Sequence, residues 1–280
     1  MVKLSVRWSR RFTGLACAAA ASPLIAMAGF AQESDEQAEL AKKVQNPVAA
    51  LISVPFQNNF EWGGGPKSEG FKYTLNFQPV IPIALSADWN LISRTIVPII
   101  HQDDVVSGSS QTGVSDILQS LFFGPAARGP GGLTWGAGPA LLLPTSTENF
   151  LDTEKFGIGP TAVVLRQESG RTYGVLANHL VSIGGTHRTA DVNATFLQPF
   201  PSYTTTTYTT FSINTESTYD WESSQRTVPL NASAGQLLTL GGQPIQFSLG
   251  PKLYVEGPSA APDWGIRCTA TLLFPTGSRT

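Results

Sequence analysis

Eight polar or charged residues lie in extended segments where they alternate with apolar residues. They are Lys72, Arg94, Asn214, Glu216, Asp220, Lys252, Glu256 and Arg267. Alternate residues of a strand share one face, so inside a closed sheet these side chains would line a wet passage and select what crosses it. Alternatively, mixed charges pair across a narrow interior and simply fill it. Neither sign dominates, so the set predicts no strong ion preference.

Catalytic chemistry and metal binding find little support in the residue pattern. The chain has three histidines, too few for a metal site that needs several convergent ligands. His179 and Ser182 are three positions apart and would point to opposite faces of a strand, which disfavours a base and nucleophile pair. Asp103-Asp104 lacks the alternating acidic pattern of a calcium loop. We expect no catalytic residue, no metal, no cofactor and no enzymatic activity.

The alternation is strongest over Phe71–Gln78, where Phe, Tyr, Leu and Phe alternate with Lys, Thr, Asn and Gln. A period of two indicates a β-strand with one apolar and one polar face. The pattern returns over 264–274 and in part over 208–221. Repeated strands of this kind are typical of a barrel that faces lipid outside and water inside.

The same patterns predict twelve strands. They cover 50–61, 71–83, 89–100, 117–123, 133–143, 157–167, 172–183, 192–203, 208–221, 228–238, 245–256 and 264–274. Connections after odd strands are mostly long and those after even strands mostly short, except for 124–132 and 222–227. Four tryptophans, at 62, 89, 221 and 264, fall at strand ends, where an aromatic girdle would lie. The predicted fold is an all-β, antiparallel transmembrane barrel of about twelve strands.

Seven prolines fall inside the predicted strands. They are Pro79, Pro98, Pro139, Pro160, Pro199, Pro229 and Pro251. Proline cannot donate to a strand ladder and belongs on edges or at bulges, yet a closed barrel has no edges. Either these prolines mark bulges, or some of the predicted strands are two shorter ones.

The N-terminal region predicts export. Four basic residues precede a mostly apolar run, no acidic residue occurs before Glu33, and small residues at Gly29 and Ala31 fit signal-peptidase cleavage after Ala31. We therefore divide the chain into a signal peptide at 1–31, a short helical segment at 32–49 and an outer-membrane barrel at 50–280. The chain has a formal net charge of −2 before it loses those basic residues, which excludes nucleic acid as a partner.

Several blocks resemble the outer-membrane transporters grouped with the MetA pathway of phenol degradation, whose members often carry the misplaced name neuromedin U. The blocks are 40–43, Asn46-Pro47-Val48-Ala49, 51–57, 78–82, 89–95, Gly138-Pro139, 214–221 and 272–275. They span most of the chain after the signal. The resemblance implies an outer-membrane barrel of Gram-negative bacteria that passes small molecules, aromatic ones among them, and it supplies no catalytic residues.

Three functions remain open at this point. The leading one is a passive outer-membrane channel or transporter for small, aromatic or hydrophobic solutes, with outer-membrane lipid and the solute as partners. The second is a non-conducting barrel closed by its side chains or by residues 33–46. The third is a soluble periplasmic binding barrel whose apolar face, with Phe71, Tyr73 and Phe77, would line the cavity. The sequence gives no indication of oligomeric state.

Overall fold

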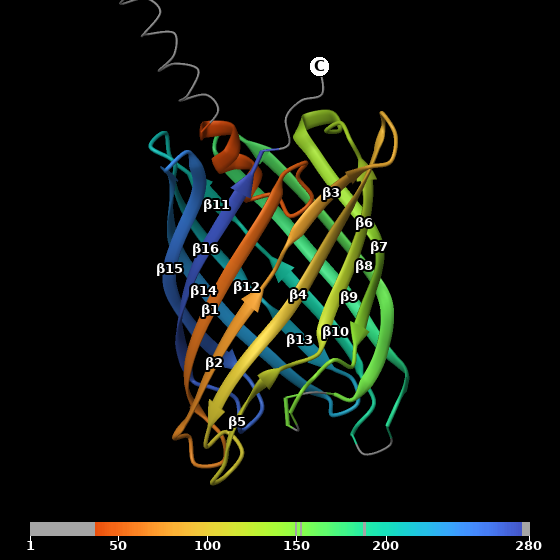
Figure 1. Cartoon of the computed structure of the whole chain (residues 1–280), viewed down its shortest axis with the longest axis vertical. Helices are drawn as coiled ribbons and strands as arrows, with labels where there is room; N and C mark the ends of the chain where they lie inside the picture. Colours follow the sequence, from red (N-terminus) through yellow and green to blue (C-terminus); the bar gives the residue numbers. More distant parts are fainter. Residues whose placement is uncertain (1–36, 149, 152, 187–188, 276–280) are drawn as a thin grey trace, which may run out of the picture. The chain divides into compact units, whose positions relative to one another are not determined.

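The chain forms a closed antiparallel barrel of twelve strands, as predicted (Figure 1). The computed structural model describes residues 37–148, 150, 151, 153–186 and 189–275, so the predicted signal peptide at 1–31 lies outside the described residues. A short helix covers 37–44. The strands are β1 Ile52–Gly64, β2 Gly70–Phe77, β3 Val80–Ala84, β4 Trp89–Asp103, β5 Ser110–Val114, β6 Ile117–Pro125, β7 Leu133–Leu143, β8 Lys155–Glu168, β9 Arg171–Gly185, β10 Asn193–Pro199, β11 Ser202–Thr204, β12 Thr209–Thr215, β13 Ser217–Asp220, β14 Gln225–Leu240, β15 Gln243–Glu256 and β16 Trp264–Phe274, with a 3₁₀ turn η1 at Pro130–Gly132.

The sixteen strand segments make twelve barrel strands, because four of the barrel strands are each broken into two segments. We call each of the twelve a stave. β2 and β3 both pair with β1 and β4, and β5 and β6 both pair with β4. In the same way β10 and β11 share β9, while β12 and β13 share β14. The barrel closes where β1 pairs with β16 from Ile52↔Phe274 to Trp62↔Trp264. Closure leaves no unpaired edge to attract another chain.

The prolines explain most of the irregularities, and both predicted solutions occur. Pro79 separates β2 from β3. Pro98 lies where β4 changes partner from β6 to β5, and Pro199 ends β10. Pro229 adjoins the register shift that follows Val228. Each therefore occupies a position where the missing amide N–H costs no ladder bond.

The remaining three prolines follow a glycine. In Gly138-Pro139, Gly159-Pro160 and Gly250-Pro251 the ladder on one side of the strand skips the dipeptide. A Cβ on these glycines would collide with the carbonyl oxygens of Leu121, His179 and Ala232 respectively. Only glycine permits this close approach of two backbones, and the strands keep the same register on both sides of each unpaired dipeptide.

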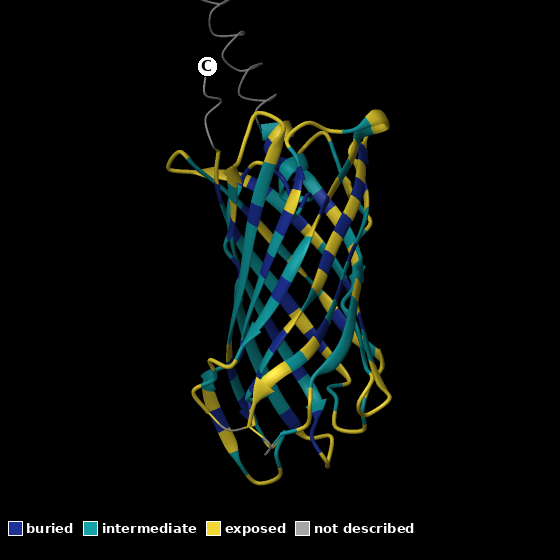
Figure 2. Cartoon of the chain, turned by 90° about the vertical axis from the view of Figure 1, so that its right-hand side faces the viewer, coloured by how far each residue is buried: buried dark blue, intermediate teal, exposed yellow. Residues whose placement is uncertain are grey.

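The two faces of the sheet differ in the way that the alternation predicts. Phe71, Tyr73 and Phe77 lie on the outside, where their rings contact Trp62, Phe60 and Phe56 at centroid distances of 5.6, 5.0 and 5.3 Å. Large apolar side chains are exposed on most strands of the barrel, and exposed residues alternate with more buried ones along several strands in Figure 2. The interior is lined instead by polar residues such as Asn76. The expectation that Phe71, Tyr73 and Phe77 line a cavity is therefore wrong.

Aromatic residues gather near both ends of the barrel wall. At one end Trp62 stacks on Trp264 at 4.7 Å, and Tyr219 meets Trp221 edge to face at 4.7 Å. At the other end Trp89 meets Trp135 edge to face at 6.1 Å. The predicted tryptophan positions thus fall into two rims.

The connections at the two ends also differ. The loop end carries 65–69, 104–109, 144–154, 186–192, 221–224 and 257–263, and the turn end carries 85–88, 126–132, 169–170, 205–208 and 241–242. The short 221–224 and the long 126–132 are the two exceptions that the sequence indicated. In Figure 1 the turn end is uppermost.

Residues 38–51, which we name the N-terminal segment, fold into the barrel at the turn end. Leu40, Ala41, Ala49 and Leu51 are buried against Leu237 and Leu273 of the inner wall. Val48 is buried in a second apolar cluster with side chains of β3, β4, β6, β8 and β9. The Lys42 carbonyl accepts a hydrogen bond of 2.8 Å from the Gln167 side chain. Helices long and apolar enough to cross a membrane do not occur in the described part of the chain, a finding that does not bear on β-barrels.

Candidate functional site

Charged side chains from β1, β2, β4, β12–β13, β15 and β16 meet inside the barrel. We name them the lumen cluster: Glu61, Lys72, Arg94, Glu216, Lys252 and Arg267. Lys72, Lys252 and Arg267 each have an apolar neighbour in the strand that faces outwards, whereas Arg94 and Glu216 lie between hydroxyl residues. The closure of the barrel brings these residues to one site. They come from five strand segments and from the short link at Glu216.

Two ion pairs brace the lumen cluster. Lys252 Nζ lies 2.6 Å from Glu61 Oε1, which also accepts a 2.5 Å hydrogen bond from the Tyr254 hydroxyl. Arg267 binds both carboxylate oxygens of Glu216, at 2.8 and 2.7 Å, and its Nε donates to Asn59 at 2.7 Å. The second pair joins β16 to the link between β12 and β13, which is not an adjacent stave. Bidentate pairs of this kind are among the strongest hydrogen-bonded contacts.

Two cations of the lumen cluster have no carboxylate partner. Among the described residues neither Lys72 nor Arg94 forms an ion pair within 4.0 Å. Lys72 is the cross-strand neighbour of Glu61, but the Glu61 carboxylate is bound by Lys252. Arg94 donates through Nη2 to Gln78 Oε1 at 3.0 Å. The cluster thus holds four cations and two anions.

This excess corrects the expectation of a balanced lumen. Asp220 lies at the loop end, where its carboxylate accepts hydrogen bonds from Glu222 N at 2.9 Å and Ser223 Oγ at 2.5 Å and so stabilises the 221–224 turn. Glu256 pairs at 2.8 Å with Arg226, and both side chains are about half exposed. Both of these predicted lumen anions therefore lie at the rim. The register shift at Val228 accompanies this placement of Glu256.

Sequence reasoning overlooked some functional positions. Glu61 continues the polar phase of β1 after Asn59, so the alternation itself could have identified it. Tyr254 faces the lumen although it is aromatic, because it shares the phase of Lys252, whose ammonium lies 5.0 Å from the Tyr254 ring centroid. Asn214, which was predicted, lines the interior and accepts a 2.9 Å hydrogen bond from Asn231.

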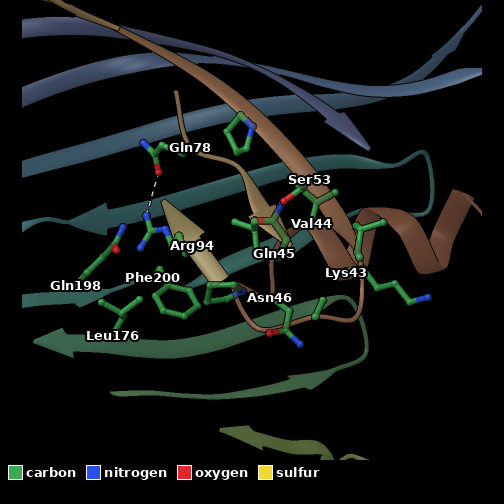
Figure 3. A pocket seen from close by; sticks show the side chains of 15 residues that line it. Lys43, Val44, Gln45, Asn46, Ser53, Gln78, Arg94, Leu176, Gln198 and Phe200 are labelled. Carbon is green, nitrogen blue, oxygen red and sulfur yellow. Dashed lines mark hydrogen bonds between the residues drawn. The ribbon is translucent and has the colours of Figure 1, made fainter. Parts of the chain in front are cut away.

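Several cavities lie in the described part of the interior, and three of them are relevant to the lumen cluster. One of about 220 Å³ lies between the N-terminal segment and the inner wall, with Val44, Arg94 and Phe200 among its lining residues (Figure 3). One of about 230 Å³ has a mostly polar wall that includes Gln57 and Arg267. The third, of about 300 Å³, is shared by Arg94 and Glu216. We name the first the segment cavity and the third the central cavity.

The residues considered for catalysis lie apart. His179 Nδ1 lies 2.9 Å from Thr195 Oγ1 on the outer face, whereas the Ser182 hydroxyl donates to Asp191 at 3.2 Å. Asp104 Oδ1 accepts a hydrogen bond from the Gly108 amide at 3.2 Å within its own loop. Within the described ranges, no group of three or more His, Cys, Asp or Glu residues is arranged to hold a metal ion.

The comparisons with known proteins agree with the fold. No family model matches the chain, and no curated protein matches its sequence. An outer membrane channel from Pseudomonas putida F1, known from its crystal structure, is similar with a TM-score of 0.61 and 15% sequence identity, over 81% of this chain and 96% of that chain. At this identity the likeness shows a shared fold. The resemblance to the transporters of the MetA pathway stays a prediction.

Proposed function

We propose that this chain inserts into an outer membrane and acts as a channel for small molecules. The observation that carries the proposal is the opposition of the two barrel faces. The outer wall is apolar between two aromatic rims, while the inner wall carries a cluster of six charged residues. Water on both sides of the wall would make an exposed belt of this extent unfavourable, and lipid outside with solute inside makes both faces favourable.

The likeness to an outer membrane channel supports the same conclusion. Bacterial outer-membrane barrels have short turns on the periplasmic side and longer loops outside. The turn end would therefore face the periplasm and the loop end the exterior. The excess of cations inside the barrel would favour anions in the lumen. We propose no enzymatic activity, since the inner wall carries charge pairs and small cavities, whereas His179 lies outside.

The N-terminal segment favours a second candidate, a barrel that does not conduct. Its buried side chains occupy the turn end of the interior, and the segment cavity beside it has a volume of about 220 Å³. In the channel proposal this segment must move, or leave a narrow path, for a solute to pass. In the alternative it is a permanent stopper.

Electrophysiology separates the two candidates. The purified mature chain is reconstituted into planar lipid bilayers, and single-channel currents are recorded. Discrete conductance steps, together with a heat-modifiable band in outer-membrane fractions, support the channel. A heat-modifiable barrel that inserts and never conducts supports the stopper, and a soluble periplasmic protein contradicts both.

A further inference from the structure

Arg94 is a lumen arginine that forms no ion pair within 4.0 Å among the residues that the structure describes. It projects from β4, and its guanidinium donates to Gln78 Oε1 at 3.0 Å. The nearest candidate, Glu216, lines the same central cavity but has both oxygens bound by Arg267. A guanidinium offers five N–H donors in a fork that matches a carboxylate. Arg94 therefore retains donors for a ligand.

The position of Arg94 connects two cavities. Gln78, Arg94 and Gln198 line both the segment cavity of about 220 Å³ and the central cavity of about 300 Å³. Figure 3 shows the three polar side chains together, with Phe200 and Leu176 beside them. A ligand group bound by Arg94 could therefore extend its remainder in either direction.

Both cavities offer apolar side chains as well as polar ones. The lining of the segment cavity includes Leu51, Val80, Leu176 and Phe200. The lining of the central cavity includes Ile96, Leu118, Leu180 and Phe196. Small-molecule sites typically combine such walls with a few placed polar groups, in cavities of roughly 300 Å³ or more. The central cavity is at the lower end of that range and fits a small ligand.

We propose that Arg94, assisted by Gln78 and Gln198, binds the carboxylate of small monoanionic molecules whose remaining part is an apolar ring or chain. This inference rests on the proposed channel function and names its substrate class. A neutral apolar molecule would leave the guanidinium donors unpaired, which is costly in a confined site. A dianion such as phosphate would place its second charge near Glu216, which disfavours it.

The test compares acids with amides of the same shape. The full mature chain, folded in detergent, is titrated by calorimetry at neutral pH with benzoate and hexanoate, and with benzamide and hexanamide. The amides keep the size and the apolar part and remove the charge. We expect each acid to bind at least tenfold more tightly than its amide, equivalent to about 1.4 kcal/mol. Equal binding of acid and amide by the wild-type chain overturns the proposal without any variant.

Two substitutions locate the effect. Arg94→Gln is expected to reduce acid binding to the level of the amide, and Arg94→Lys to retain part of the preference, because lysine keeps the charge but not the fork. The matched control is Lys72→Gln, which removes the other unpaired lumen cation at a different position and should change acid binding by no more than about threefold. An equal loss in both glutamine variants would mean general attraction by charge and would refute the site.

The failure of this inference is distinguishable from the failure of the proposed function. Binding is measured in detergent and needs no conduction. A chain that prefers acids but never conducts in bilayers contradicts the channel alone. A chain that conducts and shows no preference for acids contradicts the Arg94 site alone.

Discussion

The N-terminal segment gives the sharpest prediction, because its helix contains one buried and one exposed alanine that can be replaced in the same way. Ala41 is fully buried against Leu237 and Leu273, whereas Ala38, on the preceding turn of the helix, is exposed. Both residues are alanines in the same helix. Replacing either by glutamate changes the helix propensity equally, but only Ala41→Glu forces a carboxylate into the contact with the inner wall.

The expected size of the effect follows from the cost of an uncompensated buried charge. Such a charge costs about 3–5 kcal/mol, and each 1.36 kcal/mol changes an equilibrium tenfold. Ala41→Glu should therefore shift the balance between the docked and the released segment by roughly two to four orders of magnitude. Ala38→Glu places its carboxylate in water and should shift that balance by less than about twofold.

Two measurements check this prediction. Single-channel recording should show larger or longer-lived open states for Ala41→Glu than for the wild-type chain and for Ala38→Glu. Limited trypsin digestion should cut faster after Lys42 and Lys43 in Ala41→Glu, because both lysines are half-buried in the docked segment and a released segment is open to proteolysis.

One combination of results would refute the reasoning. If trypsin shows that Ala41→Glu releases the segment while the conductance stays at the wild-type value, the segment is not the barrier to passage. If Ala38→Glu raises conductance as much as Ala41→Glu, the added charge acts on the pore directly and not through undocking.

Three further predictions concern the barrel wall and the lumen cluster. With four cations and two anions in the lumen cluster, the wild-type pore should prefer anions. Lys72→Glu makes the numbers of cations and anions equal and should move the reversal potential in a salt gradient towards zero. A cation-selective wild-type pore would contradict the assignment of the cluster. Glu216→Gln should lower the free energy of unfolding by about 1.5–3 kcal/mol, as for a lost charged hydrogen bond, and the barrel should then unfold at a lower temperature in the heat-modification assay. Arg226→Gln, in an exposed ion pair, should lower the free energy of unfolding by less than about 1 kcal/mol. Similar losses in both variants would argue against a stabilising role for the Arg267–Glu216 pair. Leu249→Lys, near the middle of β15 on the outer wall, should cost about 2–4 kcal/mol in refolding into lipid vesicles while its lumen neighbour Ser248→Lys folds normally, and the reverse order would mean that lipid does not contact this wall.

Short-range patterns were enough to predict much of the fold. The alternation over Phe71–Gln78 identified both the strand and the face that would be polar, and its recurrence along the chain gave the twelve staves. These features depend on residues two positions apart, so they are written into each segment separately. The prolines marked irregular positions for the same local reason, although the sequence did not tell a register shift beside Pro229 from a break at Pro79.

Contacts between distant segments could not be predicted in this way. The pairing of Arg267 with Glu216 joins residues 51 positions apart, and the isolation of Arg94 depends on that pairing. The displacement of Asp220 and Glu256 to the rim follows from a turn and a register shift, neither of which has a signature in the alternation. Which lumen charges neutralise one another is set by the way the closed barrel brings staves together.

The sequence by itself therefore determined the strands, their two faces and the even number of staves, because a period of two needs no knowledge of neighbours. Only the tertiary structure decided that the lumen cluster carries an excess of cations, that Arg94 lies between two cavities, and that the N-terminal segment fills the turn end. These three features arise from closure, since a lumen and its contents exist only once β1 pairs with β16.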